Sequence, residues 1–270
     1  MKAGTRRIIL EFGIGILLTS ILACGRTMPQ PTATGIASLP PTEASFPTQT
    51  PVPLHEMVSL ISISQNETSQ KPPYTIKAQI PKLQGSEDAR VTNFNDEMTQ
   101  LTQEEIASFK DNVVQIQSQS DSSGSFYDQQ YKLFSPPGNL VSLRFQIMLY
   151  IQGAAHPGTH SRTVTYDLEA GSDVKLAQLF QPGSDYLERI ANYCIAQLKT
   201  RNIDFEAFSG GAAPLQENYG NWNITPEGLL ITFDEYQVAA YAAGAQEVVV
   251  PYTELQSVID PNGPMGGFLP

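Results

Sequence analysis

The sequence predicts an α+β fold, in which an antiparallel sheet meander carries a few amphipathic helices packed on it. Three observations predict it. Several short stretches alternate apolar and polar residues, two longer segments repeat apolar residues at helical spacing, and strand follows strand across short turns. No segment shows the order of strand, glycine-rich loop and helix that a phosphate site in a parallel fold needs.

The first group of elements is two strands and a helix. Residues 58–64 and 74–80 alternate as strands, and residues 86–113 predict a long amphipathic helix that covers one face of the sheet. The apolar face of this helix is formed by Val91, Phe94, Met98, Leu101, Ile106, Phe109 and Val113.

The second group begins with a meander and continues through a second helix. Strands are predicted over residues 125–135, 139–151, 162–171, 221–225, 229–233 and 247–250. A helix over residues 182–202 begins at Ser184, and a shorter one over residues 253–259 begins with the capping pair Thr253 and Gln256. Cys194 falls on the apolar face of the first of these helices and is expected to lie in the core.

The N-terminus is typical of an export signal. A basic start precedes a mostly apolar run over residues 8–22, and a small residue stands before Cys24. This layout resembles a bacterial lipoprotein signal peptide at residues 1–23, which implies cleavage before Cys24 and a lipid on its sulfur. The alternative is a retained membrane helix, but about 15 residues rise only about 22 Å, less than a hydrocarbon core of about 30 Å.

Composition suggests the remaining divisions. Residues 24–55 are rich in proline and threonine and predict a disordered tether, which would reach on the order of 90 Å if extended. A smaller α+β subdomain is expected at residues 56–135, a C-terminal α+β domain at 136–260 and a flexible tail at 261–270. The net charge of −11 argues against a nucleic-acid partner.

Two of the three histidines lie in the segment QGAAHPGTHSRT, residues 152–163. Gly153, Pro157 and Gly158 are expected to set the path of a turn there, because glycine and proline favour turn conformations. His156 is a candidate to fasten that turn or to face a ligand, whereas His160 is expected at the surface. His55 lies in the predicted tether.

Tyr236 and Tyr241 flank a stretch rich in alanine and glycine that includes Gly244. They are either core tyrosines or, with His156 and Gly244, a small-residue platform where a partner or a glycan docks. Trp222 is either an exposed anchor or a half-buried strand residue.

The second half of the chain resembles a known family. The segments GAAHP, TYDLEAGSDVKLAQLF, SDYLERI and GLLITFDEYQVAAYAAGAQEVVVPYTEL occur in the order found in a C-terminal domain shared by the anti-sigma-V factor ectodomain and wall-associated peptidoglycan deacetylases. YTIKAQIPKL and NFNDEM resemble the smaller domain that precedes it. In the anti-sigma-V factor this ectodomain is a receptor for lysozyme, so the resemblance implies binding of a cationic muralytic protein or of wall glycan.

A metal-dependent hydrolase or deacetylase is the alternative. Thr232 to Glu235 and the spacing of His156 and His160 resemble fragments of the polysaccharide deacetylase signature, in which two histidines and an aspartate, here Asp234, bind a metal. Their order is reversed, and Pro157 disfavours the helical turn that would align the histidines.

The leading hypothesis is therefore a non-enzymatic binding module, lipid-anchored to the bacterial cell membrane and facing outward. It predicts no catalytic residue, no cofactor and no metal. A structural lipoprotein without a small ligand is a third possibility.

Overall fold

The computed structural model describes residues 52–116, 124–134 and 138–268. The chain divides into two units, residues 1–49 and 50–270, so every described residue lies in the second unit. The predicted signal peptide and Cys24 fall outside the described residues.

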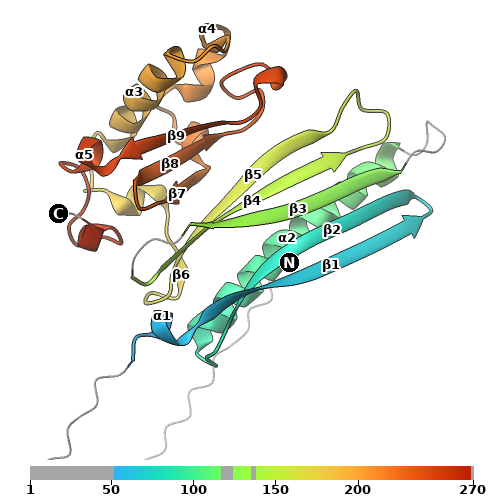
Figure 1. The fold of residues 1–270 in the computed structure, drawn as a ribbon, viewed down its shortest axis with the longest axis horizontal. Helices are drawn as coiled ribbons and strands as arrows, with labels where there is room; N and C mark the ends of the chain where they lie inside the picture. The colour runs from blue at the N-terminus through green and yellow to red at the C-terminus, as the bar shows by residue number, and fades with distance from the viewer. Residues whose placement is uncertain (1–51, 117–123, 135–137, 269–270) are drawn as a thin grey trace, which may run out of the picture. The chain divides into compact units, whose positions relative to one another are not determined.

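Within the described residues, six strands form the larger sheet in the order β1-β2-β3-β4-β5-β6 (Figure 1). They are β1 (Ser59–Gln70), β2 (Pro73–Gln84), β3 (Ser125–Phe134), β4 (Leu140–Tyr150), β5 (Gly158–Asp167) and β6 (Ser172–Asp173). Neighbours pair antiparallel except β2 and β3, which are parallel because helix α2 (Ala89–Ile116) joins them and carries the chain back to the same end of the sheet. The predicted α+β class is confirmed, and the antiparallel meander holds from β3 to β5.

Helix α2 covers one face of the larger sheet. All seven apolar residues predicted for its buried face are buried, and Phe94 and Met98 are 0% exposed. They pack in one core with the inward side chains of the sheet, among them Phe145 and Tyr166. Phe94 meets Tyr166 edge to face at 5.3 Å between ring centroids. The predicted helix is confirmed, and it continues to Ile116.

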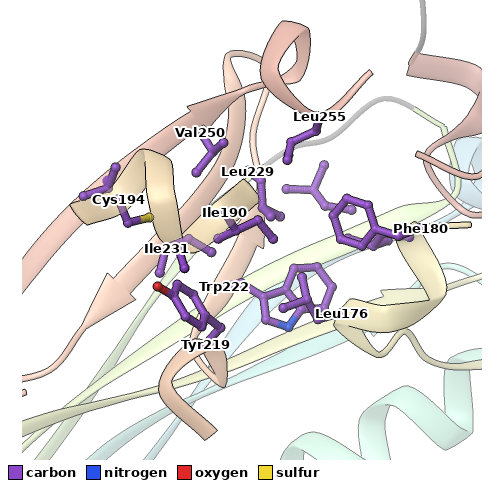
Figure 2. Close-up of a cluster of buried hydrophobic side chains, with 14 of the residues drawn as sticks. Leu176, Phe180, Ile190, Cys194, Tyr219, Trp222, Leu229, Ile231, Val250 and Leu255 are labelled. Carbon is purple, nitrogen blue, oxygen red and sulfur yellow. The ribbon is translucent and has the colours of Figure 1, made fainter. Parts of the chain in front are cut away.

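A second core lies between helix α3 (Tyr186–Lys199) and a three-stranded antiparallel sheet of β7 (Trp222–Ile224), β8 (Gly228–Phe233) and β9 (Gln246–Pro251). Figure 2 shows Cys194 and Trp222 among its buried side chains. Burial raises the pKa of the Cys194 thiol to about 12, so the thiol stays protonated. The core position predicted for Cys194 is confirmed, and Trp222 is a core residue and not an exposed anchor.

The remaining elements of the described region are short helices. The α-helical ones are α1 (Leu54–Met57), α4 (Phe205–Phe208) and α5 (Tyr252–Leu255). The 3-10 turns are η1 (Leu176–Leu179), η2 (Ser209–Ala212), η3 (Gln216–Tyr219), η4 (Tyr241–Ala243) and η5 (Gly266–Phe268).

Polar side chains attach the smaller sheet to the larger one. Ser142 and Arg144 alternate along β4 with residues of the α2 core, so they point from the opposite face. Asn223 on β7 donates to the Ser142 hydroxyl at 2.9 Å. Arg144 donates to the Thr232 hydroxyl at 2.7 Å and pairs with Glu247 at 2.8 Å. The smaller sheet therefore lies on the face of β4 that α2 leaves uncovered.

The predicted limits differ from the observed elements in several places. The limit between residues 135 and 136 falls between β3 and β4, which pair in one sheet and share its core. His55 was expected in the tether but belongs to α1, and its Nδ1 contacts Asn139 Oδ1 at 2.6 Å. Met265, in the predicted tail, is 0% exposed.

Two predicted helix ends also differ. Helix α3 begins at Tyr186 with Asp185 as its N-cap, two residues after Ser184. Helix α5 ends at Leu255, and Ile259, the predicted end, forms a bridge with Phe180 instead.

Candidate functional site

The segment between β4 and β5 turns sharply at Gly153, whose φ of 93° favours glycine. Ala154 closes the turn by donating its backbone N–H to the Ile151 carbonyl at 3.0 Å. Pro157 directly precedes β5, and Gly158 is the first residue of that strand, paired with Leu149. Of the three residues predicted to shape the turn, Gly153 thus supplies the left-handed conformation, and the other two lie where the strand begins.

His156, Tyr236 and Tyr241 form an aromatic cluster at the end of this turn. The rings of His156 and Tyr241 stack at 3.9 Å between centroids, with an interplanar angle of 25°. Tyr236 lies 5.6 Å from Tyr241 and 6.4 Å from His156, at 27° to each. Three rings from segments about 80 residues apart in the sequence therefore lie nearly parallel.

Hydrogen bonds hold the cluster in place. The Tyr241 hydroxyl donates to the Pro157 carbonyl at 3.0 Å, and His156 Nδ1 lies 2.8 Å from the same oxygen. The Tyr236 hydroxyl lies 3.3 Å from His156 Nε2. One carbonyl of the turn thus orients two of the rings, and the third ring contacts the imidazole.

The cluster faces outward. His156 is exposed, and Tyr236 is 54% exposed although its side chain is large and aromatic. The small residues Ala154, Ala155 and Ala240 beside it are also exposed. A core position, which was the alternative for Tyr236, does not describe this arrangement.

The backbone under Tyr236 is strained. Tyr236 has φ 66°, and among the described residues it is the one residue other than glycine with a positive φ. Such a conformation costs about 1–2 kcal/mol in a residue with a Cβ and is found where the surrounding structure enforces it. Gly244, at φ 66°, ends the η4 turn that carries Tyr241, so its role here is in the backbone path.

The three residues of the metal alternative have separate partners. His160 lies on β5 and its Nε2 is 3.3 Å from Glu105 on α2, whereas His156 stacks on Tyr241. Asp234 follows β8 and accepts a hydrogen bond from the backbone N–H of Ser161 at 2.9 Å. Across residues 52–116, 124–134 and 138–268, no group of three or more histidine, cysteine, aspartate and glutamate side chains is placed to hold a metal ion.

Asp234 and Glu235 have a role that the sequence did not reveal. Glu235 accepts a hydrogen bond from the backbone N–H of Thr159 at 3.0 Å, as Asp234 does from Ser161. Asp234 also accepts from Asn221 at 3.0 Å. Burial raises the pKa of Asp234, and these hydrogen bonds oppose that shift. The two carboxylates cap the outer edge of β5, and no sequence signal links residues more than 70 positions apart.

Within the part of the chain that the structure describes, no helix is both long and apolar enough to cross a membrane.

Part of the chain is similar to known proteins. Residues 177–253 match the family model described as "Protein of unknown function (DUF3298)". The peptidoglycan-N-acetylmuramic acid deacetylase PdaC of Bacillus subtilis is 24% identical over 166 residues, which are 60% of this chain and 35% of the deacetylase. The match thus spans about a third of that relative's length. The resemblance to wall-associated peptidoglycan deacetylases is confirmed for this region.

Two crystal structures have a similar fold. A DUF3298 family member from Bacteroides fragilis has a TM-score of 0.60 at 18% identity and covers 78% of this chain and 96% of that one. A DUF3298 family protein from Pseudomonas aeruginosa PAO1 has a TM-score of 0.56 at 16% identity, with 79% and 96% covered. At these identities the likeness concerns the fold alone.

Proposed function

We propose that this chain is a non-enzymatic binding module of the bacterial cell envelope, which recognises wall glycan through the aromatic cluster of His156, Tyr236 and Tyr241. The observation that carries the proposal is the exposed stack itself, with Tyr236 held outward on a strained backbone. Burying an aromatic ring is favourable, so a large ring kept in water at a conformational cost indicates a surface that becomes covered by a partner.

The chemistry of the cluster suits a sugar. Pyranose rings present a face of C–H groups that packs on flat aromatic rings and an edge of hydroxyls that needs hydrogen-bond partners. The cluster offers near-parallel rings, the Tyr236 hydroxyl and the imidazole of His156 on one side. The alanines beside the cluster are exposed as well.

The similarity to a peptidoglycan deacetylase supports a wall ligand and an extracytoplasmic location. It does not extend to a deacetylase activity here, because the match spans only 35% of that enzyme. Asp234, the aspartate of the hydrolase alternative, is already engaged by Ser161 and Asn221. A binding role uses the exposed rings and needs no further group.

The anchoring part of the proposal rests on the sequence. Residues 1–23 have the layout of a lipoprotein signal peptide, and lipid on Cys24 would hold the module at the membrane. The proline-rich segment that follows would let it reach into the wall. Mass spectrometry of the membrane-bound protein tests this: a diacylglycerol adduct on an N-terminal Cys24 is expected, and an intact residue 1–23 segment would contradict it.

Binding is tested by titrating the protein with soluble, uncrosslinked peptidoglycan glycan in a calorimeter. Saturable binding is expected, weakened about tenfold or more by Tyr236→Ala or His156→Ala, since aromatic residues at the centre of an interface often contribute 1–2 kcal/mol or more. Met148→Ala, at a residue 42% exposed on β4, is the matched control and should bind normally.

The same titration with a cationic lysozyme separates the rival partner. The glycan assignment is wrong if the glycan does not bind while lysozyme does. In that case lysozyme binding should weaken strongly with salt and should be lost in Tyr236→Ala. Stoichiometric zinc that is lost on replacing both His156 and His160 by alanine would contradict the non-enzymatic reading.

A further inference from the structure

The outer edge of β1 is a long strand edge that no described residue caps. Strand β1 is the first strand of the larger sheet and pairs on one side only, with β2 (Figure 1). It has 12 residues, about twice the usual length of a strand. Alternate residues of such a strand turn their backbone N–H and C=O groups away from the sheet, so the edge can pair with another strand.

The other strand edges of the described structure are short or capped. Strands β6 and β7 have two and three residues, and the acidic pair after β8 takes backbone donors on β5. On β9, Arg201 donates to the Glu247 carbonyl at 2.6 Å. Among the described residues, the backbone of β1 has one such contact outside β2, from the Tyr131 hydroxyl to the Ile61 carbonyl at 3.5 Å. Tyr131 lies on β3, on the far side of β2, so it leaves the outer edge of β1 open.

Strand β1 also lacks the features that keep exposed edges apart. Between Ser59 and Gln70 it has no proline, lysine or arginine. Its register with β2 continues residue by residue along the whole strand, so no bulge twists the edge away. Lysine, proline and bulges are the usual means by which proteins prevent edge pairing. Their absence over an edge of this length indicates an interface.

Charge does not oppose the pairing of two such edges. Glu67 is the charged residue of β1, and its carboxylate pairs with Lys110 on α2 at 2.7 Å. The Tyr74 hydroxyl donates to the same carboxylate at 2.5 Å. The edge is therefore close to neutral within each copy, although the whole chain has a net charge of −11. A strongly charged partner gains nothing here, whereas a second edge of the same neutral composition fits.

Ile63 stands near the middle of the edge and suits a two-fold axis. It is 45% exposed and lies opposite Ile80 of the α2 core, so its side chain is at the rim of that core. If two antiparallel copies of β1 pair about this residue, the two Ile63 side chains lie directly opposite each other, with Cβ atoms about 5 Å apart, and leave water. In the same register Glu67 lies opposite Ser59 of the second copy, so like charges do not meet.

We propose that the protein forms a symmetric dimer in which the β1 edges of two copies pair antiparallel, with Ile63 at the two-fold axis. The axis of an antiparallel strand pair is perpendicular to the sheet, so the two larger sheets join into one and both copies of α2 lie on the same face. Pairing of residues 59–67 extends over about 30 Å of strand. This contact is one strand wide and smaller than a standard interface of about 800 Å² per partner, so we expect a dissociation constant in the micromolar range.

Sedimentation velocity of the full-length protein, from about 1 µM to about 200 µM, tests the dimer. Monomer is expected at the low end and dimer at the high end, without larger species, because a two-fold contact uses up both edges. Ile63→Lys places two like charges opposite each other at the axis and should weaken the dimer about tenfold or more. Leu215→Lys makes the same change at a residue 50% exposed outside β1 and should dimerise normally.

Introduced cysteines test the register. In a full-length Cys24→Ser background, Ile63→Cys should form an intermolecular disulfide on mild oxidation, because opposite Cβ atoms lie near the distance that a disulfide spans. Cys194 is buried and does not compete. Thr68→Cys, exposed on the same strand, is the control. In the proposed register it lies roughly 34 Å from its counterpart, so it should not cross-link.

Three results would contradict the dimer as proposed. A monomer at every concentration removes it. A dimer that Ile63→Lys does not weaken lies elsewhere on the surface. Cross-linking of Thr68→Cys as readily as Ile63→Cys shows that the edges do not pair in this register. Failure of glycan binding leaves the dimer unaffected, because β1 shares no residue with the aromatic cluster.

Discussion

At the residue scale, environment gives ordinary side chains unusual properties. Glu97 is one of several acidic residues on an amphipathic helix, and its position in the sequence predicts a solvated group. The fold places it half-buried against Asp173, so its charged form is disfavoured twice, by burial and by a second carboxyl. Tyr236 is a similar case, because its backbone conformation and exposure follow from where the loop is held and not from its own preferences.

Glu97 should make stability depend on pH. Its pKa is raised from 4.5 to about 7 in the folded protein, so the folded state binds the proton more tightly than the unfolded chain. This contribution is fully present below about pH 4.5 and is lost as the pH rises through about 7. At pH 8 Glu97→Gln should therefore be more stable than the natural protein by about 1–2 kcal/mol, a value that allows for solvent screening.

At pH 5 the two proteins should have nearly equal free energies of unfolding. Urea unfolding at the two pH values measures the difference. Glu104→Gln, on the same helix, is the control. It should not change how the free energy of unfolding depends on pH. A difference between Glu97→Gln and the natural protein that stays constant with pH would contradict the assignment.

At the element scale, the outer edge of β5 shows how side chains can satisfy the backbone donors of an unpaired strand edge. Among the described residues, strand β6 pairs with Tyr166 and Asp167, and no other strand pairs with the rest of this edge. Exposed strand edges invite pairing with other chains. Here the backbone donors of Thr159 and Ser161 are taken by the carboxylates of Glu235 and Asp234. The acidic pair therefore closes an edge and ties the loop after β8 to it.

Asp234→Ala should destabilise the protein by about 2 kcal/mol, because it leaves the donors of Ser161 and Asn221 without their acceptor in a partly buried place. Hydrogen exchange of the Ser161 amide should speed up by more than the change in global stability explains. Asp128→Ala, on the half-buried face of β3, is the matched control. An unchanged Ser161 exchange rate in Asp234→Ala would show that the carboxylate does not protect the edge.

At the scale of the whole described region, two hydrophobic cores lie on opposite sides of the larger sheet, and polar contacts join the smaller sheet to it. One core joins α2 to the larger sheet, and the other joins α3 to the smaller sheet. Between them, Arg144 is 13% exposed and reaches both Thr232 and Glu247. Because polar contacts are directional, this arrangement fixes how the two sheets face each other, and with it the meeting of His156 with Tyr236 and Tyr241.

Arg144→Ala should loosen this connection. We expect the free energy of unfolding to fall by about 1–3 kcal/mol, because a mostly buried charge-assisted hydrogen bond and an ion pair are removed together. In urea, Trp222 fluorescence, which reports on the smaller sheet, should change at a lower concentration than hydrogen exchange in β3. Arg162→Ala is the control, because the Arg162 side chain is 50% exposed and its ion pair is with Glu105 of α2. Coincident transitions in Arg144→Ala would show that the two cores still unfold as one.

Local pattern predicted the elements well. The apolar spacing of the α2 segment identified all seven of its predicted buried residues, and the helical spacing around Cys194 placed that thiol in the core. Helix ends were less accurate: α5 stops at Leu255, and the predicted end Ile259 bridges to Phe180, a contact across the fold. The ligand-binding role of His156, Tyr236, Tyr241 and Gly244 stays a prediction.

By itself, the sequence determined the fold class, the order of strands and helices and the buried faces, because periodicity and turn residues act between near neighbours in the chain. Tertiary structure alone decided the stacking of His156 on Tyr241, the capping of β5 by Asp234 and Glu235, and the meeting of Glu97 with Asp173. These contacts join residues 73 or more positions apart, as the spans of 76 and 73 residues at the β5 edge illustrate. Their geometry depends on how the sheets pack, and no local pattern carries that information.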